Sequence, residues 1–500
     1  MNFRLPPTLP PTAASVLLHS YCAGLPDYMP WTTQASIKDS HLRVEKEGSD
    51  SSCLCVPWFA PEQLPGPSIL HPKVPVVLST ATLVEREAPY DLVTELARGK
   101  INQVRNQSAD WQSGGLSMTP ELDQILRKTS RAFALAVCQN TSAEEATRSF
   151  EALGQGLAAA ESLVRVYVEQ VFQARRARTP VLPTSLSCCV RSPLDEAQTA
   201  KFVAAFNSVR VPLHWREIEG EASKYVWDGP DAVVAWARQG TLPLEMGTLL
   251  DFRTHQQPDW VSKHHGDVQS LANVMVDYLE NALTRYKDVT TWHILAGMNG
   301  AAELLCLDEE ELLWLTAQLL TAALQIRPDG QFSITLTQPW GEPMAEGRWA
   351  YSPFVFADAL LRHRVQLHHL EIELIQGVRP RGSWWRDRLD ISRMLDLYAL
   401  LSIPMRVSLG CPSKAGIDPK ADADMEAEIG EDIWTPEFQA TWAEHVTALA
   451  LCKPYLVGAN WCEASDVVPH SFPWCGLLNA EGQAKPALDR LVALRTQYLR

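Results

Sequence analysis

Strands and helices alternate over the last two thirds of the chain, and this alternation constrains the fold more than any other feature. From Thr179 onward, short β-prone runs are separated by stretches whose apolar residues recur at helical spacing. A parallel pair of strands needs a crossover connection, so this alternation is typical of a parallel sheet. Eight such units predict a closed (β/α)₈ barrel, with an open doubly wound sheet as the alternative. The expected strands are Ser185–Val190, Ser208–Leu213, Pro243–Leu249, Thr290–Leu295, Phe332–Leu336, Leu370–Leu374, Met405–Leu409 and Tyr455–Trp461.

The residues before Thr179 have a different pattern. Residues 1–88 hold short β-prone segments broken by Pro and Gly, which predicts a small β-rich, sandwich-like domain. Its expected strands include Ala14–Tyr21, His41–Glu45 and Val74–Glu85. Residues 89–178 predict a helical connector packed on the barrel, with helices over Tyr90–Gln107, Pro120–Gln139 and Ala143–Arg178. We therefore expect three parts: 1–88, 89–178 and the barrel over 179–500.

Charge and apolar content exclude some classes of partner. The net charge of -15 argues against binding to nucleic acid or to an anionic membrane surface. No run approaches the ~20 apolar residues that a transmembrane helix needs. The first residues, beginning Met1-Asn2-Phe3 and soon interrupted by prolines, do not form a secretory signal peptide. The 11 Cys are odd in number and have no repeated spacing, which favours reduced thiols, so a cytoplasmic location is expected.

The last forty residues contain the most specific string. An apolar run, Tyr455–Trp461, ends in Trp, and after a loop Cys475–Leu488 reads CGLLNAEGQAKPAL and leads into a closing amphipathic helix. This ending resembles family 10 of the glycoside hydrolases, the β-1,4-xylanase family, in which a Trp closes the eighth strand and a similar string opens the final helix. The resemblance extends over about residues 179–500. It implies a (β/α)₈ barrel that acts on or binds a β-linked glycan such as xylan, with no cofactor and no metal.

Further strings carry the same resemblance and indicate a sugar site. Trp215, Gln376 and the segment Gln257–Val261 match family strings, and Asn299 matches after a two-residue shift. Aromatic faces and side-chain amides at strand ends suit stacking on, and hydrogen bonding to, a sugar ring. We expect at least three of Trp215, Trp340, Gln376 and Trp461 to line one cavity. The expected substrate-binding residues are Trp215, Asn299, Trp340, Gln376 and Trp461.

The two catalytic carboxyl groups of the family are not found at the matching positions of this chain. Retaining glycosidases need two carboxyl groups about 5 Å apart, one as nucleophile and one as acid/base. The resemblance puts the nucleophile position on Leu409 and the acid/base position on Gly297 or, with the shift, on Gly300. None of these three residues carries a carboxyl group, so the ordinary retaining mechanism is not expected.

Other carboxyl groups near the expected strand ends are candidates for a rebuilt catalytic pair. Glu342 follows the fifth strand, Glu463 follows the eighth, and Asp251 ends the third. Glu371 and Glu373 alternate with apolar residues on the sixth strand, and if that face is the barrel interior they need Arg or Lys partners. Two hypotheses remain: a glycoside hydrolase with a rearranged pair, or a glycan-binding or interaction protein built on a degenerate hydrolase barrel.

Overall fold

The computed structural model describes residues 1–500 except 8, 10–12, 26, 62–67, 139–141, 255, 380–382, 426–432 and 500, and omits the side chains of 142–146 and 379. The described chain divides into two compact units, and each contains segments that are distant in sequence. The first unit comprises Met1–Pro180, Trp340–Arg348 and Trp384–Leu397. The second comprises Val181–Pro339, Trp349–Ser383 and Tyr398–Arg500.

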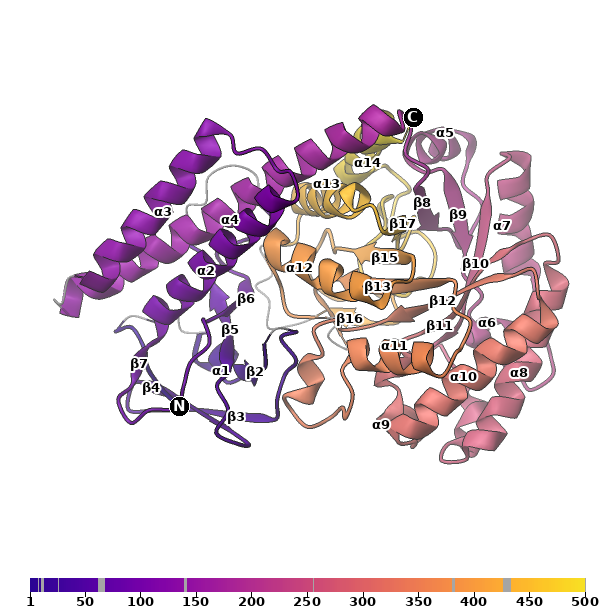
Figure 1. Cartoon of the computed structure of the whole chain (residues 1–500). Helices are drawn as coiled ribbons and strands as arrows, with labels where there is room; N and C mark the ends of the chain where they lie inside the picture. The colour runs from indigo at the N-terminus through magenta and orange to yellow at the C-terminus, as the bar shows by residue number, and fades with distance from the viewer. Residues whose placement is uncertain are drawn as a thin grey trace. The chain divides into compact units, whose positions relative to one another are not determined.

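The second unit contains a closed barrel of eight parallel strands (Figure 1). Around the ring the strands follow their order in the chain, with β17 paired to β8 to close it. The predicted (β/α)₈ barrel is confirmed, and the open doubly wound sheet is wrong. The strands are β8 (Ser185–Cys189), β9 (Ser208–Val211), β10 (Leu244–Asp251), β11 (Thr291–Ala296), β12 (Gln331–Leu336), β13 (His369–Ile375), β15 (Met405–Gly410) and β17 (Leu456–Trp461).

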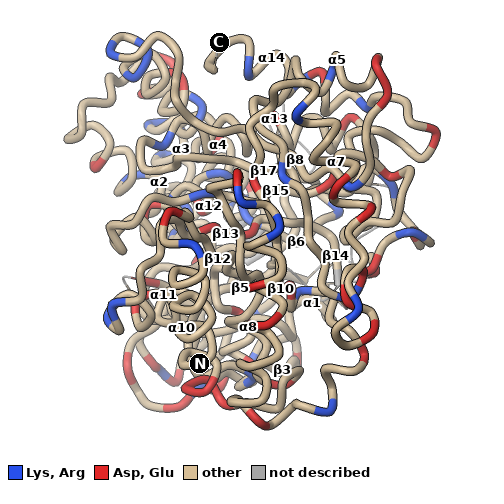
Figure 2. Tube along the Cα trace, turned by 90° about the vertical axis from the view of Figure 1, so that its right-hand side faces the viewer, with Lys and Arg blue, Asp and Glu red and all other residues tan. Residues whose placement is uncertain are grey.

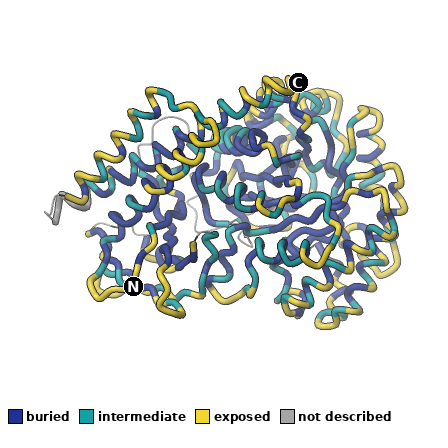
Figure 3. Tube along the Cα trace, viewed as in Figure 1, coloured by how far each residue is buried: buried dark blue, intermediate teal, exposed yellow. Residues whose placement is uncertain are grey.

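Helices connect these strands, and their ends follow local capping signals. Asp308 caps α10 with a reciprocal bond pair to Glu311, while Pro353 and Pro436 occupy first-turn positions where no backbone donor is needed. The strands are buried, and the helices expose their outer faces (Figure 3). The helices are α5 (Glu196–Ala205), α6 (Trp215–Ile218), α7 (Asp228–Gln239), α8 (Val268–Arg285), α9 (Ala302–Leu305), α10 (Glu309–Ile326), α11 (Pro353–Arg362), α13 (Pro436–Cys452) and α14 (Pro486–Tyr498).

The barrel interior is a network of ion pairs, where many barrels hold aliphatic side chains. Arg210 makes a two-pronged contact with Glu371, at 2.8 and 2.6 Å, and Arg406 donates to both oxygens of Glu245 at 2.6 Å. Glu373 likewise pairs with Arg253 at 2.7 Å. The expectation that Glu371 and Glu373 need basic partners is therefore confirmed, because a buried carboxylate without one would be strongly destabilising.

The first unit has two small sheets and a group of helices. One sheet has the order β3 (Thr33–Lys38), β4 (His41–Lys46), β1 (Asn2–Arg4), β7 (Tyr90–Asp91), and the other β2 (Tyr21–Ala23), β5 (Cys53–Phe59), β6 (Pro75–Ser79). The longer helices are α2 (Leu92–Ser113), α3 (Pro120–Cys138), α4 (Ser142–Arg178) and most of α12 (Arg388–Tyr398).

One expected strand of the first unit is wrong. The first half of the segment Ala14–Tyr21 lies in α1 (Ala13–Leu17), and β2 begins only at Tyr21. The buried residues of α1 are Ala13, Val16 and Leu17, a spacing that puts one helical face into the core. The β-prone composition of this segment therefore did not determine its structure, because its buried residues recur at helical spacing.

Charged residues of both signs are interspersed along the chain (Figure 2). Among the described residues, no helix is both long enough and apolar enough to cross a bilayer.

Candidate functional site

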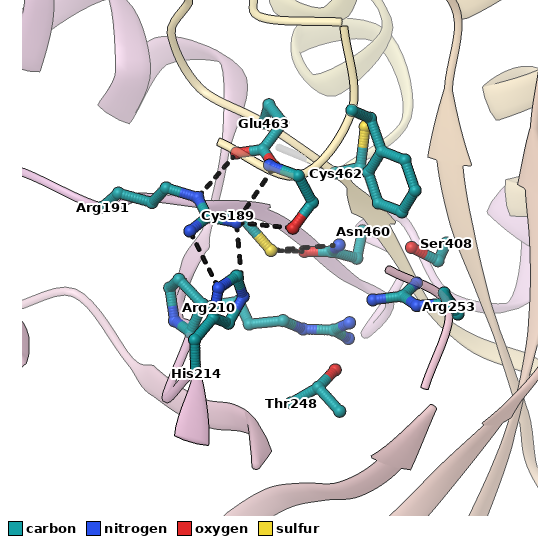
Figure 4. Close-up of a pocket in the computed structure, with 13 residues that line it drawn as sticks. Cys189, Arg191, Arg210, His214, Thr248, Arg253, Ser408, Asn460, Cys462 and Glu463 are labelled. Carbon is teal, nitrogen blue, oxygen red and sulfur yellow. Dashed lines mark hydrogen bonds and ion pairs between the residues drawn. The ribbon is translucent and has the colours of Figure 1, made fainter. Parts of the chain in front are cut away.

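A pocket lies at the carboxyl ends of the barrel strands, where barrel enzymes place their functional groups (Figure 4). Its empty volume is about 320 Å³, a figure that includes the open space at its mouth. Strand ends β8, β9, β10, β15 and β17 and the loops that follow them supply its walls. The lining residues are Cys189, Arg191, Arg210, Pro212, His214, Thr248, Arg253, Ser408, Asn460, Cys462, Glu463, Ser471 and Phe472.

Arg191 organises one wall of the pocket. Its Nε lies 3.2 Å from Glu463 Oε2, and its Nη2 donates to Ser471 Oγ at 2.7 Å. The backbone N–H of Ser471 donates to Glu463 Oε1 at 2.8 Å, which ties the same three residues together. Both oxygens of Glu463 are thus bound, by Arg191 and by the Ser471 backbone.

His214 lies against the same guanidinium. Arg191 Nη1 is 3.0 Å from His214 Nδ1 and Arg191 Nη2 is 3.3 Å from Nε2 (Figure 4). Arginine has donors only, so the imidazole nitrogen that bonds to it must accept. The imidazole serves there as a hydrogen-bond acceptor, which is a role in positioning more than in proton donation.

The opposite wall contains a second arginine with two carboxylates. Arg253 contacts Asp251 through Nε at 2.9 Å and Nη2 at 2.6 Å, and Glu373 through Nη1 at 2.7 Å. Burial raises the pKa of Glu373, and Arg253 offsets only part of that effect. Burial also acts on Asp251, but the Arg253 contacts prevail and lower its pKa. One guanidinium therefore binds two carboxyl groups, of which Glu373 has a raised pKa and Asp251 a lowered pKa.

Cys189 and Asn460 complete the floor. Asn460 Nδ2 lies 3.6 Å from the Cys189 sulfur, and Ser187 donates to Asn460 Oδ1 at 3.1 Å. Burial raises the pKa of the Cys189 thiol to about 12. A thiol in that state is not a nucleophile at neutral pH.

The positions expected for the hydrolytic pair are closed. Leu409 is buried and does not line the pocket, although its neighbour Ser408 does. Gly297 has φ +72°, and a Cβ there would lie 2.8 Å from Arg253 Cγ. A Cβ on Gly300 would lie 2.8 Å from Trp349 Cζ2. A carboxylate side chain at either glycine would require its neighbours to move.

The three candidate carboxylates occupy different surroundings. Glu463 lines the pocket, whereas Asp251 lies behind Arg253 and is not among the lining residues. Glu342 belongs to the first unit, where it accepts from Arg386 at 2.7 Å and from the backbone of Trp384 at 3.1 Å. As components of a catalytic pair, all three stay predictions.

The expected sugar-binding residues do not line this pocket. Trp215 is buried against Trp260 and Tyr278, with ring centroids 5.6 and 5.5 Å away. Trp461 is buried against Trp442 and donates its indole N–H to Cys475 O at 2.9 Å. Their apolar faces are already covered by protein.

The other three residues that were expected to bind sugar also lie outside the pocket. Asn299 exchanges hydrogen bonds with the backbone of Thr337, at 3.0 and 3.1 Å, and Gln376 is buried at the end of β13. Trp340 belongs to the first unit, under the Arg386 guanidinium at 4.9 Å. A role of these five residues in ligand binding stays a prediction that the pocket does not support.

Of the residues that line the pocket, the sequence predicted only Glu463, and those it missed include Arg191, His214, Arg253 and Asn460. Each lies at, or within three residues of, the carboxyl end of a barrel strand. Position alone would have found them, because the strand ends were predicted almost to the residue. The family comparison directed attention elsewhere, to carboxylates and tryptophans.

A second cluster near the mouth, Asp418, Asp466 and His470, has ligand-type atoms within 4.8 Å of one another. Its atoms already have partners. Lys485 Nζ lies 2.5 Å from Asp466, and His470 has Val468 O at 2.7 Å from Nδ1 and Asp418 at 2.9 Å from Nε2. A carbonyl oxygen can only accept, so Nδ1 carries a proton there. The arrangement is that of an ion-pair cluster with the lysine as its cation.

Comparison with known proteins agrees with the barrel. The family model described as glycosyl hydrolase family 10 matches residues 186–298, so the chain resembles that family over the first four strands of the barrel. Among curated proteins, no sequence matches the chain.

Solved structures of family 10 xylanases are similar at low identity. Native xylanase 10B from Thermotoga maritima is 13% identical, with a TM-score of 0.46, over 66% of this chain and 98% of that one. The family 10 enzyme from Paenibacillus barcinonensis is 15% identical, with a TM-score of 0.46, over 64% and 96%. The intracellular xylanase from Thermoanaerobacterium saccharolyticum is 16% identical, with a TM-score of 0.44, over 65% and 97%.

Proposed function

We propose that this protein binds a β-linked, xylan-like glycan in the pocket at the barrel mouth and does not hydrolyse it by the retaining mechanism. The observation that carries the proposal is the pairing of carboxylates around that mouth. Glu463 is bound to Arg191, and Asp251 and Glu373 are both bound to Arg253. The oxygens of a carboxylate that is bound by a guanidinium are engaged in hydrogen bonds, so the group is a weakened nucleophile.

The resemblance to a xylanase family supports a sugar as the ligand, and the pocket lining is compatible with one. The lining offers a hydrogen-bond acceptor on His214, an amide on Asn460, and hydroxyls on Ser408 and Thr248. Such groups bond to sugar hydroxyls of both donor and acceptor character. The charges around the pocket are largely compensated in pairs, which favours a neutral polyhydroxylated ligand over a strongly charged one.

A rebuilt hydrolase is the second candidate, and one observation favours it. The pKa of Glu373 is raised and that of Asp251 is lowered, although one guanidinium binds both. Environments that push two carboxyl pKa values apart are typical of an acid and a base that act together. Arg253 lies between the two groups, however, and neither lines the pocket.

Sugar release from β-1,4-xylan and mixed β-glucan by the purified protein tests both candidates. We expect no turnover, because each missing acid/base group removes a factor of about 10²–10⁴. Robust turnover that Glu463→Gln, Asp251→Asn or Glu373→Gln abolishes would refute the binding proposal and support the rebuilt hydrolase.

Calorimetric titration with xylobiose and xylohexaose tests binding directly. We expect measurable affinity that weakens roughly five- to tenfold in His214→Ala and in Asn460→Ala, the effect of losing one or two hydrogen bonds. Arg362→Ala is the control, because Arg362 lies on α11 with its side chain 78% exposed. No binding by the wild-type protein, with its fold intact by circular dichroism, would contradict the proposal.

A further inference from the structure

A hydrogen bond crosses the barrel mouth. Gln256, in the loop after β10, donates through its side-chain amide to the carboxylate of Asp422, in the loop after β15. In the ring of eight strands, β10 and β15 are four places apart, which is directly opposite. A contact between their loops must therefore span the opening.

The segment that reaches across is Asp418–Ala423, which we call the strap. Its backbone is bonded to the loop after β17: His470 N donates to Lys420 O at 2.9 Å, and Ala423 N to Ser471 O at 3.0 Å. The His470–Asp418 pair, at 2.9 Å, fixes its beginning. Beyond the strap, β16 (Asp424–Met425) pairs with β14 (Val378–Arg379). Both ends of the strap are thus anchored.

Asp422 of the strap lies close to residues of the pocket wall. Asp422 is within electrostatic reach of Arg191, His214 and Glu217, of which the first two line the pocket. Ser471 and Phe472, which belong to the loop bonded to the strap, are themselves part of the pocket wall. On the other side of the mouth, Gln256 is held in place by the Arg216 N–H, which donates to its carbonyl at 2.9 Å.

We propose that the strap, held by the Gln256–Asp422 bond, restricts the pocket to the terminal units of a saccharide and excludes the interior of a long polymer. This inference rests on the proposed glycan-binding function and names the class of glycan. An internal stretch of polysaccharide must enter and leave a site, which requires a groove open at two sides. A bond that joins opposite loops closes that path, whereas a chain end needs an opening on one side only.

The first test measures access without any sugar. Cys189 lines the pocket, and burial keeps its thiol unreactive while the mouth is closed. Its alkylation by iodoacetamide, followed on its own peptide by mass spectrometry, therefore reports opening of the mouth. We expect alkylation to be roughly tenfold faster in Gln256→Ala and in Asp422→Ala, because losing a hydrogen bond to a charged group shifts an open–closed equilibrium by about that factor. Asp424→Ala is the matched control. It removes the same charge two residues further on, from an exposed side chain that contacts no charged group among the residues whose side chains the structure describes.

The second test measures selectivity. Wild type is expected to bind xylobiose and xylohexaose with similar molar affinity and to bind β-1,4-xylan in proportion to its chain ends. Gln256→Ala and Asp422→Ala are expected to gain about tenfold in apparent affinity for xylan, with little change for xylobiose.

The outcomes separate the two proposals. Faster alkylation of Cys189 in both variants, with no sugar bound by any form, would leave the strap closing the mouth but overturn both the glycan ligand and the chain-end selectivity. Sugar binding with equal affinity for xylan in wild type and variants would overturn the chain-end restriction alone. Unchanged alkylation in both variants would overturn the closure itself.

Discussion

At the scale of single residues, the barrel interior is unusual because charge takes the place of aliphatic packing. Arg210, Arg406, Glu245 and Glu371 are all nearly inaccessible to solvent and form a continuous set of ion pairs. Such a set is not in itself a strong source of stability, since removing four charges from water is costly. It does make each member dependent on the others.

Replacing Arg210 by methionine should therefore be costly. The change leaves Glu371 without its two-pronged partner and Glu245 with one contact fewer. Loss of one member of a buried pair typically lowers the free energy of unfolding by about 3–5 kcal/mol. Urea denaturation followed by tryptophan emission measures it. Arg362→Met, which breaks an exposed pair with Asp358 on α11, should cost no more than about 1 kcal/mol. Equal effects of the two changes would contradict this account.

The candidate site could be predicted only in part at this scale. The sequence located the strand ends correctly, so it located the mouth. It could not show which strand-end residues meet there, because that depends on loops that return over the opening. Arg253 illustrates this: its position after the third strand was visible, but its contact with Glu373 joins residues 120 positions apart.

At the scale of elements, the loops after β15 and β17 act as one piece, and His470 is their central contact. Its ring lies between Val468 O and the Asp418 carboxylate and is completely buried. Burial alone would lower the pKa of His470, but the hydrogen bond to Asp418 and the nearby Glu463 raise it above its ordinary value. The charged groups around it also include Asp466 and Lys485 from the same cluster.

The raised pKa predicts a pH dependence with a definite sign. A folded-state pKa above the unfolded value of about 6.5 means that the contribution of His470 to stability is complete below that pH. It is lost as the pH rises through the folded-state pKa. The difference in unfolding free energy between wild type and His470→Gln should therefore be larger at pH 6 than at pH 9. Denaturation curves of both proteins at matched ionic strength measure it, and a difference that is flat or grows with pH would count against the ion pair.

At the scale of the whole molecule, the barrel was predictable from the sequence. The set of chain segments that make up the first unit was not. Every barrel strand was predicted to within three residues at each end, because a buried parallel strand between helices has a strong local pattern. The segments Trp340–Arg348 and Trp384–Leu397 lie between barrel strands in the sequence yet belong to the first unit. No local pattern distinguishes a loop that stays on the barrel from one that joins another core.

These two returning segments predict that residues 1–180 do not fold alone. In the first unit Lys100 is fully buried, and its ammonium is neutralised by Asp387 at 2.6 Å and Asp390 at 3.3 Å. Glu161 is likewise bound to Arg388 at 2.7 Å, and the Trp385 indole donates to Ile69 O at 2.9 Å. A fragment ending at Pro180 lacks all of these partners and would have to bury two uncompensated charges or expose its core.

The expected result is a fragment with helical circular dichroism but no cooperative thermal transition and poorly dispersed amide resonances, since α2 and α4 can form helix without a fixed core. The matched comparison is Asp387→Asn in the full-length chain, which removes one of the two charges facing Lys100 and leaves Asp390 in place. It should lower the unfolding free energy by less than the roughly 3–5 kcal/mol that loss of a whole buried pair costs. A fragment that unfolds cooperatively, with stability near that of the intact protein, would show that the returning segments are dispensable. In that case, the buried pairs they form would have to be replaceable by water or by residues within 1–180.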